Sequence, residues 1–502
     1  MNLDLLIDSI LSPIADRISS VIFYSVNIKG VEVQLLIALL MFAVVYFTIR
    51  LRFIGFWGFK NALKLLFHKF RHKDSIKRKK YGEVSSFQAL SATISSSAGI
   101  GNVAGSAAAV SIGGPGVIFW MFVAGLFSMA LKFAEILLGV KLREINEDKT
   151  VSGGPMYYIS KGLKGPILSI IAPYLGKLYA LCSVLAVIGG WNLFQINAMT
   201  TQIIETTGAQ NSVFYNNAWI IGVIVATVTW VTIIGGIKSI GKFTAKVTPI
   251  MCALYLISIL IISIINIHNI PTTIRTIVVE AFYPKAMVGG VCACALWGFR
   301  RAMFANEAGL GTAPTAFSAV KTNKPAVQAF IGMLQPFVDT CIVGVSTAFV
   351  IVVSGEYLNV SGIAGIELTS KAFATAFSFF PILLTIMASC FVLGTMLCGS
   401  YYGLQGWQFL FGNSTAKTRA FQIIYCICII FGSAMNFKSI INLSDAVTLF
   451  MAVPNLFALF VLSNVVVKEV KRYCKKYNVG LFKIEKEVNI DDDDNDETNI
   501  TE

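Results

Sequence analysis

Long apolar segments recur along the chain, and short polar stretches separate them. Each segment has about 17 residues or more, which is enough for a helix to cross ~30 Å of hydrocarbon. The predicted spans are residues 33–50, 87–111, 115–141, 178–205, 218–235, 246–268, 286–311, 326–354, 379–402, 419–437 and 443–467. The pattern therefore predicts an all-α integral membrane protein with about 11 transmembrane helices.

The composition excludes a soluble globular domain. Only 13% of the 502 residues are charged and the mean hydropathy is +0.72, whereas soluble domains carry about 25% charged residues. The chain has three histidines, and none lies in a metalloprotease-type helix motif. We therefore expect neither an enzyme nor an organic cofactor.

The basic residues that give the net charge of +13 lie mainly in the loops between the spans, which is not the pattern of a nucleic-acid-binding surface. Eleven Lys and Arg residues lie between Arg50 and Lys80, three lysines lie in residues 236–246, and none lies in 206–217. Lys and Arg accumulate in cytoplasmic loops, and contact with anionic membrane lipid is the alternative explanation. The distribution predicts an N-terminus outside the cell, a cytoplasmic C-terminus and no nucleic-acid partner.

Two predicted spans contain helix-breaking residues. The second span carries the sequence GIGNVAG at residues 99–105, and the seventh carries FANEAGLG at residues 304–311. The two spans lie five apart, so they enter the membrane from opposite sides, and paired interrupted segments of this kind indicate the binding site of a transporter with inverted repeats. We take residues 87–285 as the first repeat and 286–467 as the second.

A broken helix offers chemistry that a continuous helix does not. Free N–H groups and a positive dipole end can receive a carboxylate, and freed carbonyls can coordinate a cation, so an α-amino acid with both charges is a suitable ligand. The alternative is that Gly101 and Gly105 form a GxxxG packing notch between helices. The matching break in the seventh span favours the binding site.

Several stretches, in this order, resemble the alanine or glycine:cation symporter family of bacteria and archaea. They are FQALSATISSSAGIGNVAG, GGPGVIFWMFVAGLFSMALKFAE, GGPMYYI, WNLFQINAM, IGGIKSIGKFTAK, FANEAGLGTAP, FVDTCIVGVSTAF and GSYYG. The resemblance implies a leucine-transporter-type fold with a five-plus-five inverted repeat, discontinuous helices 2 and 7, and an extra N-terminal helix. It also implies a symporter in the plasma (inner) membrane that imports a small neutral amino acid, alanine or glycine, with Na⁺ by alternating access.

The span pattern and the resemblance together divide the chain, and the motif matches together with the intramembrane charges give the expected site residues. The expected regions are residues 1–32 (extracytoplasmic), 33–86 (extra helix and basic loop), the two repeats, and 468–502 (acidic, disordered cytoplasmic tail). The expected substrate-binding residues are Gly99, Ile100, Gly101, Asn102, Gln195, Asn197, Phe304, Asn306 and Gly309. The expected cation-binding residues, for Na⁺ as the metal ion, are Ser97, Thr395, Glu307 and Asp339.

Other roles stay open for these polar residues. Gln195 could instead form a helix–helix hydrogen bond, Glu307 could pair with Arg300 or Arg301, and Asp339 could be a hydrogen-bonded structural carboxylate. The third span contains Lys132 and Glu135, three residues apart on one helix face. An ion pair between them is the simplest explanation.

The chain departs from the family pattern at two positions where hydroxyl groups are usual. Ile100 stands in place of a threonine and Gly394 in place of a serine. A proton-coupled transporter, or one of altered specificity, is therefore the alternative function, followed by a channel or a sensor-like paralogue. The sequence indicates a small amino acid and membrane lipid as partners; it does not determine the oligomeric state, and a monomer would suffice.

Overall fold

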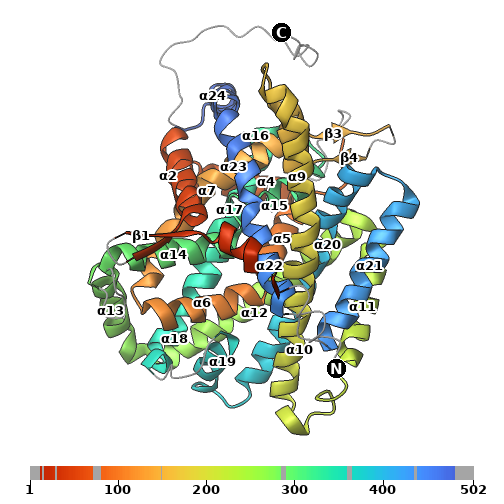
Figure 1. The fold of residues 1–502 in the computed structure, drawn as a ribbon. Helices are drawn as coiled ribbons and strands as arrows, with labels where there is room; N and C mark the ends of the chain where they lie inside the picture. The colour runs from red at the N-terminus through yellow and green to blue at the C-terminus, as the bar shows by residue number, and fades with distance from the viewer. Residues whose placement is uncertain are drawn as a thin grey trace.

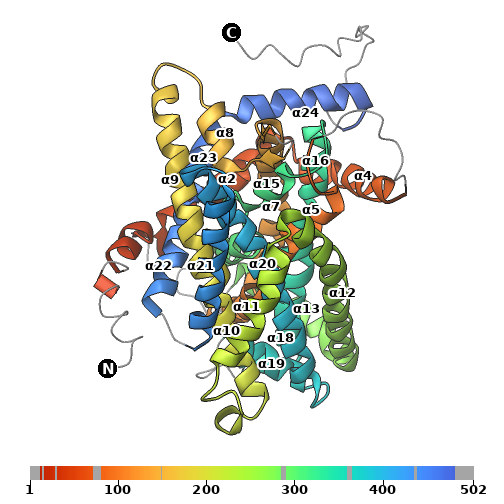
Figure 2. The same cartoon turned by 90° about the vertical axis from the view of Figure 1, so that its right-hand side faces the viewer.

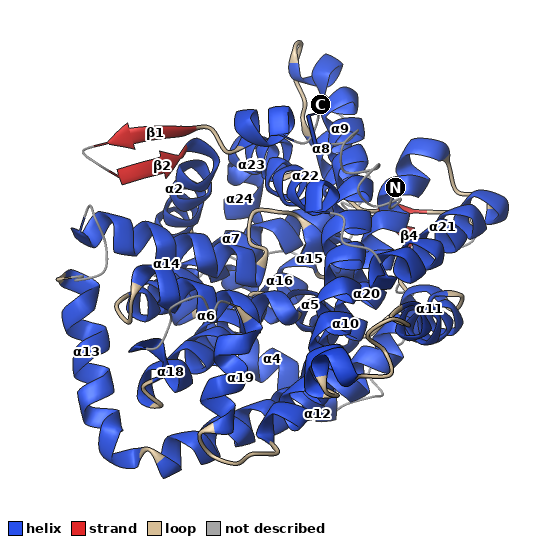
Figure 3. Cartoon of the chain, turned by 60° about the horizontal axis from the view of Figure 1, so that its bottom comes forward, coloured by secondary structure: helices blue, strands red, loops and turns tan. Residues whose placement is uncertain are grey.

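The computed structural model describes residues 12–13, 16–28, 31–71, 81–147, 150–283, 290–358, 365–434 and 438–480. These residues form a bundle of helices with two short antiparallel hairpins, β1–β2 and β3–β4 (Figures 1 and 3). The strands are β1 (Ser25–Ile28), β2 (Val31–Gln34), β3 (Glu144–Ile145) and β4 (Val151–Ser152). The all-α prediction is confirmed.

In the described part of the chain, seven helical stretches are long and apolar enough to cross a membrane. They are Val117–Lys141, Leu168–Thr206, Gly236–Ile265, Pro325–Val353, Phe380–Phe411, Thr415–Ala434 and Leu443–Val461. Shorter apolar helices are Leu35–Arg50, Ile100–Gly113 and Trp219–Ile233. Each of them overlaps a predicted span, because long apolar runs favour burial in lipid whatever their tertiary contacts.

The helices of the first repeat begin with a broken pair. They are α5 (Ser86–Ser97), α6 (Ile100–Gly113), α7 (Val117–Lys141), α9 (Leu168–Ile188), the π-helical turn η1 (Gly189–Leu193), α10 (Phe194–Thr206), α11 (Trp219–Ile233) and α12 (Gly236–Ile265). Helix α2 (Leu35–Arg50) precedes them and packs on α7. Helix α7 lies near the middle of the bundle (Figure 1), and its residues 128–140 are all buried.

The second repeat begins with the other broken pair. Its helices are α14 (Gly290–Asn306), α15 (Thr312–Ser318), α16 (Pro325–Gly332), α17 (Leu334–Pro336), the π-helix η4 (Phe337–Gly344), α18 (Val345–Val353), α20 (Phe380–Phe411), α21 (Thr415–Ala434), α22 (Lys438–Phe450) and α23 (Ala452–Val461). Both α14 and α15 pack on α7. The uninterrupted helix α7 therefore supports the break of the second repeat.

Further helices lie outside the predicted spans or at their ends. They are α3 (Ile54–Trp57), α4 (Phe59–Arg71), α8 (Pro155–Gly162), α13 (Ile270–Phe282), α19 (Ile366–Ala374), α24 (Ser463–Tyr477) and the 3₁₀ turns η2 (Ala209–Asn211), η3 (Ile267–Asn269) and η5 (Glu356–Leu358). Helix α24 lies across one end of the bundle (Figure 2).

The structure corrects the expected start of the disordered tail. Helix α24 continues through residues 468–477, because Val466, Val470 and Tyr473 recur at helical spacing and are buried while the lysines between them are exposed. The many basic residues of this stretch lead to the prediction of a solvated tail, although its apolar residues recur at the spacing of an amphipathic helix. The acidic run at residues 491–496 lies outside the described residues.

A backbone bridge joins the ends of α5 and α15 that point away from the two breaks. Val84, just before α5, pairs in parallel with Val320, just after α15. The Arg143 guanidinium donates to the Ser318 and Val320 carbonyls, each at 2.7 Å, and also to the carbonyls of Tyr81 and Thr322. Burial lowers the pKa of Arg143 to about 10, so the group stays charged at neutral pH.

Candidate substrate and cation site

The break in the second predicted span lies between α5 and α6. Helix α5 ends at Ser97 and α6 begins at Ile100, with Ala98 and an extended Gly99 (φ −63°, ψ −176°) between them. The Asn102 N–H donates to the Gly99 carbonyl at 3.0 Å. The first N–H groups of a helix have no partner within it, so the start of α6 offers donors to an anion.

The break in the seventh span lies between α14 and α15. Helix α14 ends at Asn306, and left-handed backbone follows at Glu307 (φ +54°), Gly309 (φ +90°) and Gly311 (φ +82°). Glycine adopts this conformation readily, whereas a glutamate there is uncommon and needs support from its surroundings. The Asn306 side-chain oxygen gives part of that support by accepting the N–H of Ala308 at 2.9 Å.

A cavity of about 310 Å³ lies between the two breaks. Its walls come from the α5–α6 break, α6, the η1–α10 junction, α14 and α22. The lining residues are Ser96, Ser97, Gly99, Gly101, Asn102, Gly105, Ala108, Ala109, Gly190, Trp191, Phe194, Gln195, Trp297, Arg300, Arg301, Phe304, Glu307, Leu310, Asp445 and Thr448. Both repeats therefore contribute to one chamber.

Polar atoms in the cavity wall have unused hydrogen-bonding capacity. Among the described residues, Asn102 Nδ2 and Oδ1, Gln195 Oε1 and Arg301 Nε have no hydrogen-bond partner. Asn102 is 1% exposed. A buried polar group left unpaired costs about 1–3 kcal/mol, so these atoms are suited to a polar ligand.

Glu307 brings a carboxylate to the same cavity. Its Oε2 accepts the hydroxyl of Thr312 at 2.5 Å. Within the part of the chain that the structure describes, no ion pair joins Glu307 to Arg300 or Arg301; the Arg301 guanidinium instead donates to the Gly101 carbonyl. The cavity therefore presents helix N–H groups, the carboxyl groups of Glu307 and Asp445, and the guanidinium groups of Arg300 and Arg301.

A second polar group, centred on Asp339, lies behind the cavity wall. The π-helix η4 carries Asp339, whose carboxyl contacts the Ser97 hydroxyl. Gln335 donates to Ser97 Oγ at 3.1 Å and to the Asn306 carbonyl at 3.2 Å. Asp339 Oδ1 and Gln335 Oε1 have no partner among the described residues, and π-helical turns are frequent at functional sites.

Thr395 on α20 lies against the other side of the α5–α6 break. Its hydroxyl donates to the Ser95 carbonyl at 2.9 Å. A Cβ added at Gly394 would overlap Ser95 Oγ. The space of the missing side chain at position 394 is therefore filled by the hydroxyl of Ser95.

The structure brings some of the sequence-predicted residues to the cavity and not others. Ser97, Gly99, Gly101, Asn102, Gln195, Phe304 and Glu307 line it. Ile100, Asn197, Asn306, Gly309, Asp339 and Thr395 do not. Ile100 points into the hydrophobic core, and Asn197 donates to the Gly432 carbonyl at 3.4 Å. For Ile100 and Asn197 the direction of the side chain decides this, because neighbours on a helix face different ways.

The sequence reasoning also missed residues around the cavity. Trp191, Trp297, Asp445 and Thr448 line it, and so do Arg300 and Arg301, which the sequence indicated only as possible partners of Glu307. Among these residues only the charged ones carried a signal, because charges are costly within the membrane. The predicted ion pair of Lys132 and Glu135 is confirmed at 3.6 Å. Its contacts with the break in the second repeat were not predicted.

Known proteins resemble this chain in sequence and in fold. The sequence model of the sodium:alanine symporter family matches residues 17–487. Sodium/alanine symporter AgcS of Methanococcus maripaludis is 35% identical over 87% of this chain and 94% of that protein. Amino-acid carrier protein AlsT of Bacillus subtilis is 31% identical over 89% of this chain and 90% of that protein.

Among solved structures, MhsT in complex with L-phenylalanine aligns with a TM-score of 0.53 and 14% identity. The alignment covers 78% of this chain and 92% of MhsT, and it confirms the leucine-transporter-type fold. The chain thus belongs to the sodium:alanine symporter family: it is a multi-pass membrane transporter of the cation-coupled amino-acid symporter class, not an enzyme.

Proposed function

We propose that the protein imports alanine or glycine together with Na⁺ by alternating access. The cavity between the two helix breaks carries the proposal, because it combines the start of α6 with Glu307, the unpartnered Asn102 amide and the unpartnered Gln195 Oε1. The names of AgcS and of the family support the choice of alanine and sodium.

The substrate would bind through both of its charges. Its carboxylate is placed at the start of α6 beside Gly99, where helix N–H groups and the helix dipole favour an anion. Its ammonium group faces the Glu307 carboxylate. Gln195 and Asn102 complete the hydrogen bonds, and Phe304 with the aromatic wall limits the side chain.

The Na⁺ ion would bind at the α5–α6 break beside Thr395. Carbonyl oxygens freed by broken helices are common Na⁺ ligands in transporters of this architecture. Thr395 supplies one hydroxyl and Ser95 the other, which compensates for the glycine at position 394.

Proton coupling is the second candidate, and the contacts of Ser97 favour it. A serine hydroxyl has one hydrogen, and Ser97 Oγ lies 2.9 Å from the Thr93 carbonyl as well as against Asp339. If that hydrogen goes to Thr93, the contact with Asp339 needs a proton on the carboxyl. Lys132 and Glu307 are the other charged groups acting on Asp339, and Cys252 of α12 lies near it.

Uptake of labelled alanine into proteoliposomes tests both candidates. Import of a zwitterion with one cation moves one net charge, so 100 mV supplies about 2.3 kcal/mol, or about 50-fold accumulation. Accumulation driven by a Na⁺ gradient alone, and lost in Thr395→Ala, supports Na⁺ coupling. Accumulation driven by a proton gradient alone, and lost in Asp339→Asn, supports proton coupling. No accumulation with either gradient contradicts both.

A further inference from the structure

The interrupted segment at residues 307–311 exposes backbone groups at membrane depth, where each needs a partner. The Lys132 ammonium group donates to the Glu307 carbonyl at 2.9 Å. The Tyr179 hydroxyl donates to the Leu310 carbonyl at 2.8 Å. Two helices of the first repeat, α7 and α9, therefore satisfy carbonyls of the break in the second repeat.

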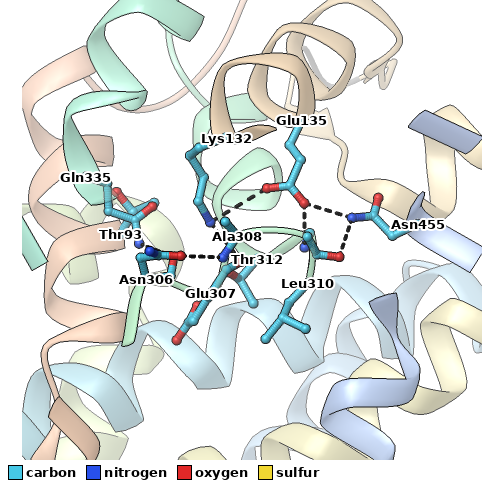
Figure 4. A network of polar contacts seen from close by, with 12 residues as sticks. Thr93, Lys132, Glu135, Asn306, Glu307, Ala308, Leu310, Thr312, Gln335 and Asn455 are labelled. Atoms are coloured by element: carbon cyan, nitrogen blue, oxygen red, sulfur yellow. Dashed lines mark hydrogen bonds and ion pairs between the residues drawn. The ribbon is translucent and has the colours of Figure 1, made fainter. Parts of the chain in front are cut away.

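Glu135 and Asn455 hold the remaining part of the segment. Glu135 Oε1 accepts the Gly311 N–H at 3.1 Å and Asn455 Nδ2 at 2.8 Å. Asn455 Nδ2 also donates to the Gly309 carbonyl at 2.8 Å. Figure 4 shows Lys132 and Glu135 reaching the segment from α7, with Asn455 approaching from another helix. We call Lys132, Glu135 and Asn455 the clamp.

The clamp also contains a buried ion pair, so it depends on charge as well as on hydrogen bonds. Lys132 and Glu135 are both 0% exposed, and their charged atoms lie 3.6 Å apart. Removing one partner of a buried pair leaves the other charge uncompensated, which is strongly unfavourable. The two charges therefore have to be kept together, and together they keep the segment in place.

Asn455 also connects the clamp to the cavity wall. It belongs to α23, which follows α22 after a single intervening residue, Met451. Thr448 of α22 lines the cavity, and the Asn455 side-chain oxygen accepts the hydroxyl of Tyr158 on α8. One helix pair thus contacts the cavity at one point and the interrupted segment at another.

We propose that Glu135 and Asn455 are positioning residues of the substrate site. They fix the shape of residues 307–311, and through it the place of the Glu307 carboxylate, and they couple that shape to α23. The effect on transport rests on the proposed amino-acid import, whereas the effect on the segment does not. Neither residue lines the cavity.

Variants of Glu135 separate positioning from simple packing. Glu135→Gln keeps an acceptor for the Gly311 N–H but leaves Lys132 without its charge partner, and Glu135→Ala removes both. Glu469→Gln is the matched control. Glu469 of α24 forms an ion pair at 2.9 Å with Lys141, the last residue of α7, so this variant also removes the charge partner of an α7 lysine. The wild type and each variant are purified and reconstituted separately, and the thermal unfolding of each protein is measured.

The first readout is alanine uptake at varied substrate concentration. We expect KM to rise about tenfold or more in Glu135→Ala, by less in Glu135→Gln, and not in the control. In the combined variant Glu135→Gln/Asn455→Ala, the fold-increase in KM should be smaller than the product of the fold-increases in the two single variants, because both residues act on one segment. A fall in Vmax with KM unchanged in all clamp variants would overturn the positioning role.

The second readout is hydrogen–deuterium exchange of the peptide that covers residues 307–312, without substrate. We expect faster exchange in Glu135→Gln and Asn455→Ala than in the wild type and the Glu469 control. Unchanged exchange in folded clamp variants overturns the proposal. If the wild type accumulates no alanine, the proposed function fails, and the exchange rates still decide whether the clamp fixes the segment.

Discussion

A methyl group added at Gly99 should weaken substrate and cation binding more than it weakens the fold. Gly99 has φ −63° and ψ −176°, an extended conformation that alanine also adopts, so Gly99→Ala introduces no backbone strain. The added Cβ would lie 2.8 Å from Thr395 Oγ1 and 3.1 Å from both Gln195 side-chain polar atoms. The first of these distances is too short for a real Cβ contact.

The clash can be relieved only by moving the two side chains that we place at the cation and the substrate. Overpacking of this kind costs about 1–3 kcal/mol. If the cost falls on the ligand-bound state, the KM for alanine rises about 5- to 150-fold, at 1.4 kcal/mol for each factor of ten. The unfolding temperature should fall only slightly, because the atoms that meet the added Cβ are the ends of side chains and not backbone.

Gly101→Ala is the matched control for the same assay. Its added Cβ meets no atom within 4 Å, although Gly101 also lines the cavity. Uptake kinetics in proteoliposomes and thermal unfolding are measured for both variants. Equal KM values in the two variants, with both proteins folded, would refute the reasoning, because the effect would then not depend on Thr395 and Gln195.

Three further substitutions test other parts of the site. Asn102→Ala removes an amide without protein partners in the described structure, so the unfolding temperature should change little while KM rises about tenfold, measured on the same preparation. Glu307→Gln should raise KM about 10- to 150-fold through loss of a charged hydrogen bond to the substrate ammonium, and an unchanged KM would remove Glu307 from the site. Arg143→Gln loses contacts with four carbonyls at the α5–α15 bridge and should lower the free energy of unfolding by about 3 kcal/mol, which denaturant titration measures.

The two helix breaks could be located from the sequence because their residues act locally. Glycines at positions 99, 309 and 311 and the Asn306 side chain weaken a helix wherever they occur. The roles of the side chains around the breaks were less accessible. The motif predicts Asn306 as a substrate ligand; in the structure its amide donates to Thr340 Oγ1 at 3.1 Å and its side-chain oxygen supports the turn.

The missing hydroxyl at position 394 illustrates the same limit. The sequence shows a glycine where a cation ligand is usual, which favours a change of coupling ion. In the structure Ser95, almost 300 residues earlier in the chain, fills that space from α5. A compensation between distant positions depends on how helices pack, and one sequence contains no record of that packing.

The sequence by itself determined the membrane class, most of the span positions and the location of both breaks. Hydrophobic length and backbone preference are properties of short segments, and lipid imposes them on each segment separately. Tertiary structure decided which side chains reach the cavity, and it placed Lys132, Glu135 and Asn455 on the freed backbone of residues 307–311. Those contacts join α7 to α23 across more than 300 residues, so they exist only once the helices have packed.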